Sequence, residues 1–467
     1  MIFDLRKFKK NLALITENET FTYEDLNIAS EKIASMVSER CLAFLFCTNT
    51  VESIAGYIGF LNNKIVTAMI DHDLDFKLTL KLIEIYQPKY IWLPKNLSQN
   101  FSYEEIFEWR DYILLSTNKS SFNLFSDLAL LMTTSGSTGS PKFVRQSYEN
   151  IISNTESIVE YLNLNSNDRA VTNLPMNYVY GLSIINTHLK VGASIVVTEK
   201  TLFQKEFWTL IKEKEITNLN GVPYTFSMLE KLRFFKMELP SLKLITQAGG
   251  KLEPRLHKKF AEYAFANHKK FFVMYGATEA TARMGYLPAE NALKKCGSIG
   301  IAIPGGKFEL IDVNGKIIEN PNEIGELIYY GKNVTLGYAQ CGEDLSLGDV
   351  NHSKLETGDL ALKDEENYYT IVGRKKRFLK MFGKRTNLQE VEHLLCEKFR
   401  DEEFACTGID DKMYIFITND KFIDEIVPFI SSKINLHQSA FEVKLIECIP
   451  KNSSGKIIYK ELEKFYE

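Results

Sequence analysis

The stretch Leu131-Met-Thr-Thr-Ser-Gly-Ser-Thr-Gly-Ser-Pro-Lys142 follows an apolar run and consists mainly of small and hydroxylated residues. Gly136 and Gly139 permit positive φ angles and close approach of the backbone to a ligand, and successive N–H groups in such a loop make a concave anion site. Lys142 adds a compact positive charge. Hydroxyl donors are supplied by Thr134, Ser135, Ser137 and Thr138. The stretch therefore predicts a loop that binds a polyphosphate.

The same stretch does not match the Walker A pattern G-x-x-x-x-G-K-[ST], because Pro141 stands where the second glycine should be. A flexible linker rich in serine and glycine has a similar composition. Taken alone, the stretch leaves both interpretations open, and the motifs in the rest of the chain have to decide between them.

The composition is that of an ordinary globular protein. The chain has 467 residues, of which 45% are apolar and 25% charged, and its formal net charge is −4. This length suggests roughly two to four domains or subdomains. The lack of a basic excess argues against a nucleic-acid partner, and no apolar run approaches the roughly 18 residues that span a bilayer.

The cysteines indicate the compartment. The seven cysteines are odd in number and scattered, with no C-x-x-C pair. This pattern argues against a disulfide framework and against a structural zinc site. Because such unpaired cysteines are typical of a reducing compartment, we expect a cytoplasmic protein with no membrane span.

The first part of the chain alternates between short apolar runs and amphipathic segments. The runs 41–47, 65–70 and 90–93 predict buried strands, and the segments 52–61 and 75–86 predict helices. The same alternation returns further along, at 170–198 and 208–246. Repeated strand–helix–strand units predict an α/β fold in which parallel or mixed sheets are covered by helices.

The last third of the chain has a different pattern. Between residues 297 and 338, glycines separate short strand-like runs, which predicts a small and more antiparallel subdomain. After Gly373 the pattern restarts with a hairpin around Gly383, a helix at 388–399 and a strand at 443–446. This order of elements predicts a separate α+β domain at the carboxyl end.

We therefore predict two domains. The large body spans residues 1–375 and contains the nucleotide and acid pockets, and the small mobile domain spans residues 376–467. Its size, about 90 residues, lies within the usual range for a domain. The boundary is expected near Lys376.

A second glycine pair, Gly249-Gly250, follows Ala248 at the end of a predicted strand at 242–246, and helix-like sequence begins at Pro254. Small residues at the carboxyl end of a strand allow the backbone to approach a flat ligand. A tight turn between a strand and a helix would have the same sequence. The pair alone therefore does not establish a site.

The run Phe272-Val-Met-Tyr-Gly-Ala-Thr-Glu-Ala280 predicts a strand that delivers several kinds of side chain to one turn. Tyr275 can stack on a base, Thr278 can donate to a phosphate oxygen, and Glu279 can hold a Mg²⁺ ion bound to that phosphate. A hairpin with a surface glutamate is the alternative interpretation.

Three further residues suit a nucleotide but are weak signals alone. Asp359, which follows a glycine, is of the type that accepts both hydroxyls of a ribose, although Gly-Asp is common in turns. Arg374, at the end of a predicted strand, is suited to grip ribose or phosphate. Lys456 follows Gly455 on a loop and either reaches a developing anion or is a solvated surface lysine.

Together, these motifs resemble the adenylate-forming (AMP-binding) superfamily, which includes acyl- and aryl-CoA synthetases, luciferases and the adenylation domains of peptide synthetases. The resemblance runs from about Phe21 to Leu462, and its most specific segments are 134–142, 275–279, 357–359, 373–374 and 450–456. It implies an ATP-dependent acid–thiol ligase. Such an enzyme forms an acyl-AMP, releases pyrophosphate and then transfers the acyl group to a pantetheine thiol.

The resemblance also implies which residues bind ATP and Mg²⁺. The loop from Thr134 to Lys142 would hold the β- and γ-phosphates, Thr278 would contact the α-phosphate, and Glu279 with Thr134 would hold the metal ion. Lys456 would bridge the attacking carboxylate and the α-phosphate, so Lys456, Thr278 and Glu279 are the predicted catalytic residues. The remaining nucleotide contacts would come from Ala248, Gly249, Gly250, Tyr275, Gly276, Ala277, Asp359 and Arg374.

By the same resemblance, Lys376 falls at a hinge. The small domain would rotate there, withdrawing Lys456 and presenting Gly383 to line a tunnel for the thiol. That thiol belongs to CoA or to the phosphopantetheine of an acyl or peptidyl carrier protein. The short carboxy-terminal domain leaves little room for accessory CoA contacts and mildly favours a carrier protein.

The acid pocket is expected around Leu174-Pro-Met-Asn-Tyr-Val-Tyr-Gly-Leu182. Tyr178 stands where the family has a histidine or another aromatic residue, and we expect it to gate the pocket. Val179 stands where amino-acid-activating relatives carry an aspartate, and because an unpaired buried ammonium is costly, an α-amino acid is disfavoured. A small or medium acid with a polar group, a short acyl chain or an aryl group fits better. The predicted pocket residues are Asn177, Tyr178, Val179, Tyr180, Gly181, Asn220, Tyr224, Thr281 and Met284.

Three alternative functions remain to be weighed. An acyl-AMP ligase dedicated to a carrier protein would not use free CoA efficiently. A nucleotide sensor would have lost the reaction, yet Lys142, Glu279 and Lys456 are all present. A kinase or P-loop ATPase would release ADP and would need a Walker A loop, which the sequence lacks.

Overall fold

The computed structural model describes residues 2–120, 122–133, 142–375, 377–382, 384–400, 402–451 and 457–466. The chain divides into two compact units: the first comprises Met1–Lys307 and Tyr329–Leu355, and the second comprises Phe308–Ile328 and Glu356–Glu467. The boundary predicted near Lys376 falls on a residue outside the described ranges and stays a prediction. Within the described ranges, no helix combines the length and the apolar character needed to cross a bilayer.

One sheet of the first unit has the strand order β16-β15-β14-β13-β12-β10-β11-β1-β2. Neighbouring strands from β14 to β1 are parallel, and β2, β15 and β16 form antiparallel edges. The strands are β1 (Leu12–Ile15), β2 (Thr20–Thr22), β10 (Arg169–Val171), β11 (Ser194–Val196), β12 (Asn218–Gly221), β13 (Leu244–Gln247), β14 (Lys270–Tyr275), β15 (Gly285–Leu287) and β16 (Ile301–Ala302).

A second sheet of this unit has the order β19-β9-β8-β4-β3-β5-β7-β6, with β8, β4, β3 and β5 parallel. Strand β3 is buried at every position, as expected of a parallel strand covered on both faces. The strands are β3 (Leu42–Cys47), β4 (Val66–Asp71), β5 (Tyr90–Pro94), β6 (Glu104–Trp109), β7 (Tyr112–Ser116), β8 (Leu128–Thr133), β9 (Phe143–Ser147) and β19 (Gly337–Ala339).

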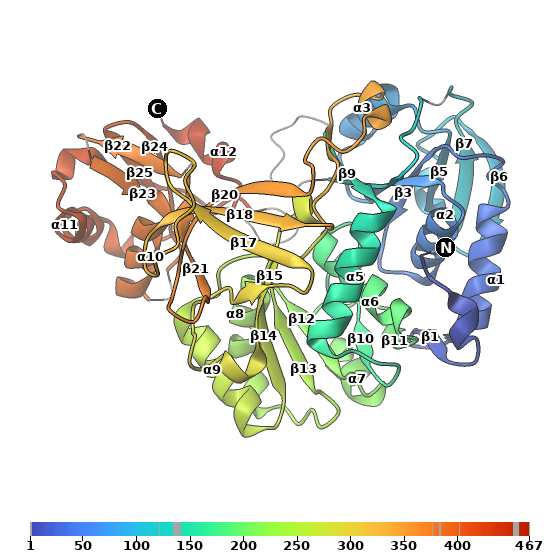
Figure 1. The fold of residues 1–467 in the computed structure, drawn as a ribbon, viewed down its shortest axis with the longest axis horizontal. Helices are drawn as coiled ribbons and strands as arrows, with labels where there is room; N and C mark the ends of the chain where they lie inside the picture. Colours follow the sequence, from blue (N-terminus) through green and yellow to red (C-terminus); the bar gives the residue numbers. More distant parts are fainter. Residues whose placement is uncertain are drawn as a thin grey trace. The chain divides into compact units, whose positions relative to one another are not determined.

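Four helices of the first unit, α1, α2, α3 and α5, begin at residues whose side chains cap them. Thr22 caps α1 by accepting from the N–H of Asp25, and Ser147 caps α5 by accepting from the N–H of Asn150, which satisfies N–H groups that a helix start leaves without partners. The helices are α1 (Tyr23–Ala34), α2 (Val51–Asn62), α3 (Phe76–Tyr86), α4 (Lys95–Ser98), α5 (Tyr148–Leu162), α6 (Val179–Lys190), α7 (Lys205–Glu213), α8 (Pro223–Lys231) and α9 (Pro254–Ala266). Figure 1 shows α9 lying beside β14.

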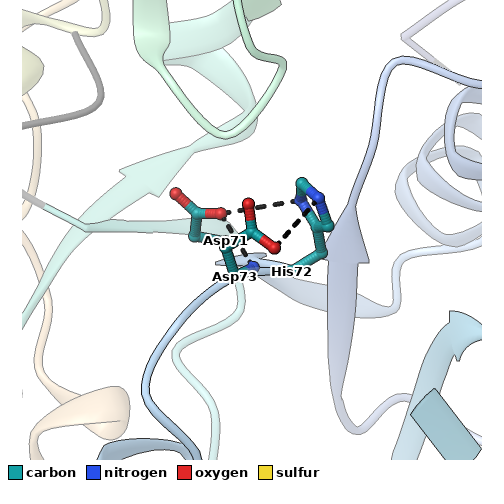
Figure 2. A group of neighbouring side chains, drawn as sticks. All are labelled: Asp71, His72 and Asp73. Atoms are coloured by element: carbon teal, nitrogen blue, oxygen red, sulfur yellow. Dashed lines mark hydrogen bonds and ion pairs between the residues drawn. The ribbon is translucent and has the colours of Figure 1, made fainter. Parts of the chain in front are cut away.

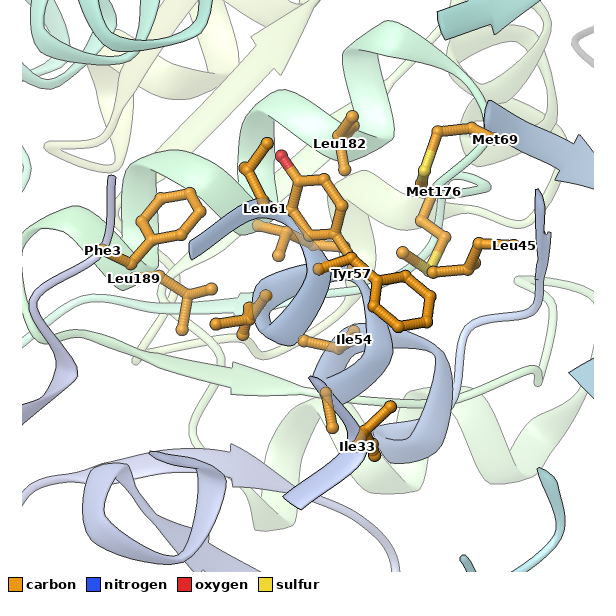
Figure 3. Close-up of a cluster of buried hydrophobic side chains, with 14 of the residues drawn as sticks. Phe3, Ile33, Leu45, Ile54, Tyr57, Leu61, Met69, Met176, Leu182 and Leu189 are labelled. Atoms are coloured by element: carbon orange, nitrogen blue, oxygen red, sulfur yellow. The ribbon is translucent and has the colours of Figure 1, made fainter. Parts of the chain in front are cut away.

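A continuous apolar core joins the two sheets of the first unit. Ile54 and Tyr57 of α2 are fully buried, and Leu182 and Leu189 of α6 are nearly so; Figure 3 shows these side chains packed in one cluster. The hydroxyl of Tyr57 donates to Oδ1 of Asn186 on α6 at 3.0 Å. Burying each side chain of this size contributes about 1.5–3 kcal/mol, so α2 and α6 hold the two sheets together.

The second unit contains most of a sheet with the order β17-β18-β20-β21, a β22–β23 hairpin and a sheet with the order β24-β25-β26. Its strands are β17 (Gly306–Ile311), β18 (Gly325–Gly331), β20 (Lys354–Lys363), β21 (Tyr369–Arg374), β22 (Phe378–Met381), β23 (Lys384–Asn387), β24 (Ala405–Ile409), β25 (Lys412–Ile417) and β26 (Phe441–Leu445). Its helices are α10 (Leu388–Lys398), α11 (Ile423–Ile434) and α12 (Tyr459–Leu462).

The predicted α/β fold class is confirmed. The segments 41–47, 52–61, 65–70, 75–86 and 90–93 correspond to β3, α2, β4, α3 and β5. The helix predicted at 388–399 is α10, and the strand predicted at 443–446 overlaps β26. The short 3₁₀ helices are η1 (Leu5–Phe8), η2 (Phe234–Lys236), η3 (Thr278–Ala280), η4 (Ala289–Asn291), η5 (Glu343–Ser346), η6 (Asp420–Phe422), η7 (Gln438–Ala440) and η8 (Glu463–Phe465).

Candidate active site

The turn after β14 carries the residues predicted to contact phosphate and metal. Strand β14 ends at Tyr275, and η3 follows immediately. A Cβ at Gly276 would lie 1.8 Å from the carbonyl oxygen of Ala282, so only glycine fits there. Thr281 and Ala282 have φ angles of 59° and 144°, which are unfavourable for residues with a side chain. Tight packing therefore holds Thr278 and Glu279 on a strained turn.

Asn333 fixes this turn from a neighbouring loop. Its Nδ2 donates to the carbonyl oxygens of Ala280 and Arg283, both at 2.8 Å, and its own carbonyl accepts from the hydroxyl of Thr281 at 2.7 Å. Asn333 is 3% exposed, so water does not compete for these bonds. The hydroxyl of Thr281, a predicted pocket residue, therefore bonds to the backbone at Asn333 and fixes the turn.

Tyr338 of β19 brings Lys142 and Glu279 together. Its hydroxyl donates to Oε1 of Glu279 at 2.6 Å, and Nζ of Lys142 lies 4.2 Å from the centroid of its ring. Burial raises the pKa of Tyr338, and the carboxylate of Glu279 raises it further, so the hydroxyl remains protonated and continues to donate. The sequence predicted Lys142 and Glu279 separately but missed Tyr338, which connects them.

The predicted nucleotide-binding turn at 248–250 follows β13. Gly249 has a φ of 86°, and a Cβ there would lie 2.6 Å from the hydroxyl oxygen of Tyr178 and 3.0 Å from Cγ1 of Val222. Tyr178 therefore lies directly against this turn. Burial raises the pKa of Tyr178, and nearby Arg283 partly offsets that effect. A residue predicted for the acid pocket and a turn predicted for the nucleotide are thus neighbours.

The other predicted pocket residues lie in different surroundings. Val179 and Gly181 are buried in the first turn of α6, and a Cβ at Gly181 would lie 2.1 Å from the carbonyl oxygen of Pro175. Gly181 therefore allows close packing of α6. Asn177 is half-buried, whereas Tyr224 on α8 is 45% exposed and lies outside the buried group.

A cavity of about 20 Å³ lies between α5, α6 and the strands β12, β13 and β14. Tyr180 and Asn220, both predicted for the pocket, line it together with Arg283. Arg283 is 3% exposed, and its guanidinium carbon lies 4.0 Å from the centroid of the Tyr180 ring. The sequence analysis missed Arg283. Its only signal is a single charge in the otherwise uncharged run Ala280-Thr-Ala-Arg-Met-Gly-Tyr286.

Two predicted nucleotide contacts meet in the second unit. Asp359 on β20 and Arg374 on β21 are register partners, and Nε of Arg374 lies 2.9 Å from Oδ1 of Asp359. Asp359 is 4% exposed, while the side chain of Arg374 is 64% exposed. The ion pair orients the carboxylate, and the exposed guanidinium stays accessible.

Some predicted site residues lie outside the described ranges, although the residues that flank them are placed. Thr133 of β8 is the register partner of Phe143 of β9, and Lys451 forms an antiparallel bridge with Ile457. Thr133, Phe143, Lys451 and Ile457 are therefore placed, and the structure describes nothing of 134–141 or 452–456. The predicted residues outside the described ranges are Thr134, Ser135, Gly136, Ser137, Thr138, Gly139, Lys376, Gly383 and Lys456.

Asp71, His72 and Asp73 form a separate cluster after β4, with ligand atoms within 4.8 Å of one another (Figure 2). Oδ1 of Asp71 accepts from the N–H of Asp73 at 3.1 Å, and the ring nitrogens of His72 lie 3.6 and 3.4 Å from the two carboxylates. The side chain of Asp73 is 84% exposed. These contacts describe a solvated turn, and we assign no ion to it.

Comparison with known proteins identifies the class. Residues 4–339 match the family described as AMP-binding enzyme, and the chain belongs to this adenylate-forming family. It is an ATP-dependent, AMP-forming acid–thiol ligase, which activates a carboxylic acid as its acyl-adenylate.

Particular relatives are similar over most of the chain. The 2-succinylbenzoate–CoA ligase of Listeria monocytogenes is 24% identical over 484 aligned positions, which cover 98% of this chain and 97% of the relative. The enzyme of the same description from Oceanobacillus iheyensis is 27% identical over 373 positions, covering 78% and 75%. The structure of O-succinylbenzoate coenzyme A synthetase from Bacillus subtilis, in complex with ATP and a magnesium ion, matches with a TM-score of 0.77 at 20% identity and covers 98% of both chains. This last likeness concerns the fold.

Proposed function

We propose that the chain adenylates a small or medium carboxylic acid and transfers the acyl group to the thiol of CoA. The observation that carries the proposal is the contact series from Lys142 through Tyr338 to Glu279. It joins a predicted phosphate ligand to a predicted metal ligand beside the turn that carries Thr278. The second supporting observation is the position of Tyr178 against Gly249, which makes the acid pocket and the nucleotide turn neighbours.

The reaction brings two anions together, because the carboxylate attacks the α-phosphate in line. Charge neutralisation is therefore the main catalytic requirement. Lys142 would neutralise the outer phosphates and Thr278 would donate to the α-phosphate. Glu279 would hold Mg²⁺, which supplies further charge neutralisation when bound. Mg²⁺ fits at Glu279, because Oε2 of Glu279 has no hydrogen-bond partner among the described residues and carboxylate oxygen is a preferred ligand of that ion.

Residues of the second unit are proposed to take further parts in the reaction. Asp359 and Arg374 would hold the ribose, and their ion pair supports that role because it orients both side chains. Lys456 would bridge the attacking carboxylate and the α-phosphate. Rotation about Lys376 would then withdraw Lys456 and bring Gly383 to the thiol tunnel.

CoA is the proposed acceptor because the relatives described above are CoA ligases. A carrier protein is the alternative that the sequence left open. Val179, which is 6% exposed, offers no carboxylate to the ammonium group of an amino acid, so the acid is not expected to be an α-amino acid. The cytoplasmic location stays part of the proposal, and it rests on the odd number and scattered positions of the seven cysteines in the sequence.

Acid-dependent exchange of labelled pyrophosphate into ATP tests the first half-reaction. Lys456→Ala should lower exchange by about 100- to 1,000-fold, because it removes a charge that acts on the transition state. The same variant should form thioester from preformed acyl-AMP at nearly the normal rate. Lys451→Ala is the matched control, since Lys451 pairs with Glu403 at 2.7 Å on the same segment and has no proposed part in the reaction. If no acid in a broad panel supports exchange, the proposal is wrong.

The acceptor is tested by offering the acyl-AMP to free CoA and to a phosphopantetheinylated carrier protein in parallel. Efficient thioester formation with free CoA supports the proposal. Thioester formed only on the carrier protein would overturn the choice of CoA and establish the alternative ligase.

A further inference from the structure

Arg283 is buried without a carboxylate partner in the part of the chain that the structure describes. Its polar contacts are few. Nη1 lies 3.2 Å from the carbonyl oxygen of Ala282, Nη2 lies 3.5 Å from Oγ of Ser183, and Nε lies 3.5 Å from Sδ of Met274. The hydroxyl of Tyr161 is a further neighbour, and it carries no negative charge. A guanidinium group has five N–H donors, and a buried charge is costly unless it is paired. The side chain is therefore incompletely satisfied.

A second donor faces the same cavity without an acceptor. Oδ1 of Asn220 accepts from the hydroxyl of Thr246 at 2.6 Å, which fixes the orientation of the amide. The hydroxyl of Tyr180 donates to the carbonyl oxygen of Thr246 at 2.9 Å and holds this arrangement in place. Nδ2 of Asn220 is then buried with no hydrogen-bond partner in the described structure, and Asn220 lines the cavity with Arg283.

These two observations indicate the charge of a ligand that would bind to Arg283 and Asn220. Both unsatisfied groups are hydrogen-bond donors, and one carries a full positive charge. His188 also lines the cavity, but burial lowers its pKa, so the charge comes from Arg283. A carboxylate, with two oxygens and about four lone-pair sites, would satisfy Arg283 and Asn220 together.

The cavity lies next to the place where the acyl-adenylate would form. The ring centroids of Tyr178 and Tyr180 are 6.4 Å apart, so the residue against the nucleotide turn is a neighbour of the residue that covers Arg283. A cavity of about 20 Å³ holds roughly one water molecule, so a carboxylate requires a small rearrangement of the wall. Met274 lines the cavity, and its unbranched side chain adapts readily.

We propose that Arg283 and Asn220 bind a second anionic group on the acid, so that the substrate is a dicarboxylic acid or an acid of equivalent charge. The inference rests on the proposed function and deepens it by naming the substrate class. One carboxylate of the acid is adenylated, and the other is held by Arg283 at the far end of the pocket. The same positive charge would repel the ammonium group of an amino acid.

The test compares dicarboxylic acids of increasing length with their half-amides, which have nearly the same shape but lack the second charge. Pyrophosphate exchange and mass spectrometry of the acyl-AMP measure kcat/KM for each member of a pair. We expect the enzyme to prefer at least one diacid over its half-amide by about 100-fold or more, since an unpaired buried charge would remain with the half-amide. Arg283→Met should remove that preference, Arg283→Lys should retain part of it, and Arg255→Met on the surface should retain all of it.

Asn220→Asp provides a second variant of unchanged shape. It supplies Arg283 with a carboxylate from the chain itself, so we expect activity on the diacid to fall more than activity on the half-amide. Equal use of diacids and half-amides by the unaltered enzyme, or an equal loss for both in Arg283→Met, would overturn the inference while leaving the proposed function standing. Absence of any acyl-AMP in both series, while another acid of the broad panel forms one, would likewise overturn only the inference. Absence of exchange with every acid of the panel would overturn the proposed function and this inference with it.

Discussion

The guanidinium groups of Arg377 and Arg283 are both largely removed from water, but among the residues that the structure describes only Arg377 meets a carboxylate. In the second unit, Arg377 donates to both oxygens of Glu392 at 2.9 and 3.1 Å and lies 3.7 Å from the centroid of the Tyr459 ring. Glu392 also accepts from the N–H of Cys406 at 2.7 Å. In the first unit, Arg283 faces the ring of Tyr180 and donates to the carbonyl oxygen of Ala282 at 3.2 Å, and two further polar contacts are at 3.5 Å.

Arg145, a buried arginine of the first unit, does find hydrogen-bond acceptors for its guanidinium group. Arg145 is fully buried and donates to the carbonyl oxygens of Leu336 at 2.8 Å, Tyr338 at 3.1 Å and Gly348 at 3.3 Å, and also to that of Leu347. In Arg377 and Arg145, the guanidinium donors are therefore bonded by acceptors that the chain itself supplies. Arg283 is left incomplete beside the candidate active site, as expected of a residue that binds a ligand.

The largest effect on stability is expected at the ion pair between Arg377 and Glu392. Glu392→Ala should destabilise the region around α10 by about 3–5 kcal/mol, because it leaves the charge of Arg377 buried and unpaired. Hydrogen–deuterium exchange of peptides covering α10 and β24 measures this as faster exchange. Glu397→Ala is the control on the same helix. Its side chain is 62% exposed, and the loss should be under about 0.5 kcal/mol. Equal effects of the two variants would contradict the comparison.

Arg145→Leu should have the next largest effect, about 2–3 kcal/mol, because charge-assisted bonds to carbonyl groups are lost and the carbonyls remain buried. Urea unfolding followed by tryptophan fluorescence measures it. Arg40→Leu is the matched control: Arg40 also donates to carbonyl oxygens, those of Lys64, Phe125 and Leu128, but it is only half-buried, so water can replace its bonds. An equal loss in Arg40→Leu would show that burial is not the deciding factor.

A surface pair should contribute less and depend on pH. Glu230 accepts from Nη1 and Nη2 of Arg255, both at 2.8 Å, and these bonds lower the pKa of Glu230 to about 2. Because the folded-state pKa lies below the ordinary value, the stabilisation is present above about pH 4.5 and is lost as the pH falls towards 2. Glu230→Gln should cost about 0.5–1 kcal/mol at pH 7 and less at pH 3, measured by urea unfolding at both values. Glu253→Gln is the control, at an exposed position 3.2 Å from Arg255, and should change the free energy of unfolding little at either pH. A loss for Glu230→Gln that grew at low pH would show that the ionised carboxylate of Glu230 does not stabilise the fold.

The smallest effect on stability is expected at Arg283, which has no carboxylate partner among the described residues. Arg283→Met should change the free energy of unfolding by less than about 1 kcal/mol, or raise it, since replacing a poorly paired buried charge by an apolar side chain is often neutral or stabilising. Thermal unfolding without substrate measures it. A loss as large as that of Glu392→Ala would show that Arg283 is a structural residue, and the comparison would fail.

The sequence predicted those parts of the fold and site that depend on neighbouring residues. Apolar runs gave β3 and β4, and amphipathic segments gave α2 and α3, because burial on a strand or helix repeats over a few residues. Gly249 has a φ of 86°, which the sequence did not predict, and its role in binding the nucleotide stays a prediction. The domain boundary and the roles assigned to Thr278, Glu279 and Lys456 stay predictions.

The sequence could not predict contacts between distant segments. Tyr338 lies 59 positions from Glu279, and nothing in the residues around either one indicates that they meet. Arg283 was missed for a different reason: hydrophobic patterns assign charged residues to the surface, and a buried charge becomes visible only when its surroundings are known. Val179, by contrast, disfavours an α-amino acid as the substrate, because it stands where amino-acid-activating relatives carry an aspartate, and the sequence alone is enough to see this.

The central claim is that Arg283 holds a second anionic group of the acid. A crystal structure of the enzyme with a non-hydrolysable analogue of the preferred diacid's acyl-adenylate tests it most directly. We expect the second carboxylate to lie within hydrogen-bond distance of the Arg283 guanidinium and of Nδ2 of Asn220. A second carboxylate in solvent, with the contacts of Arg283 unchanged from those described above, would show that Arg283 does not bind the acid.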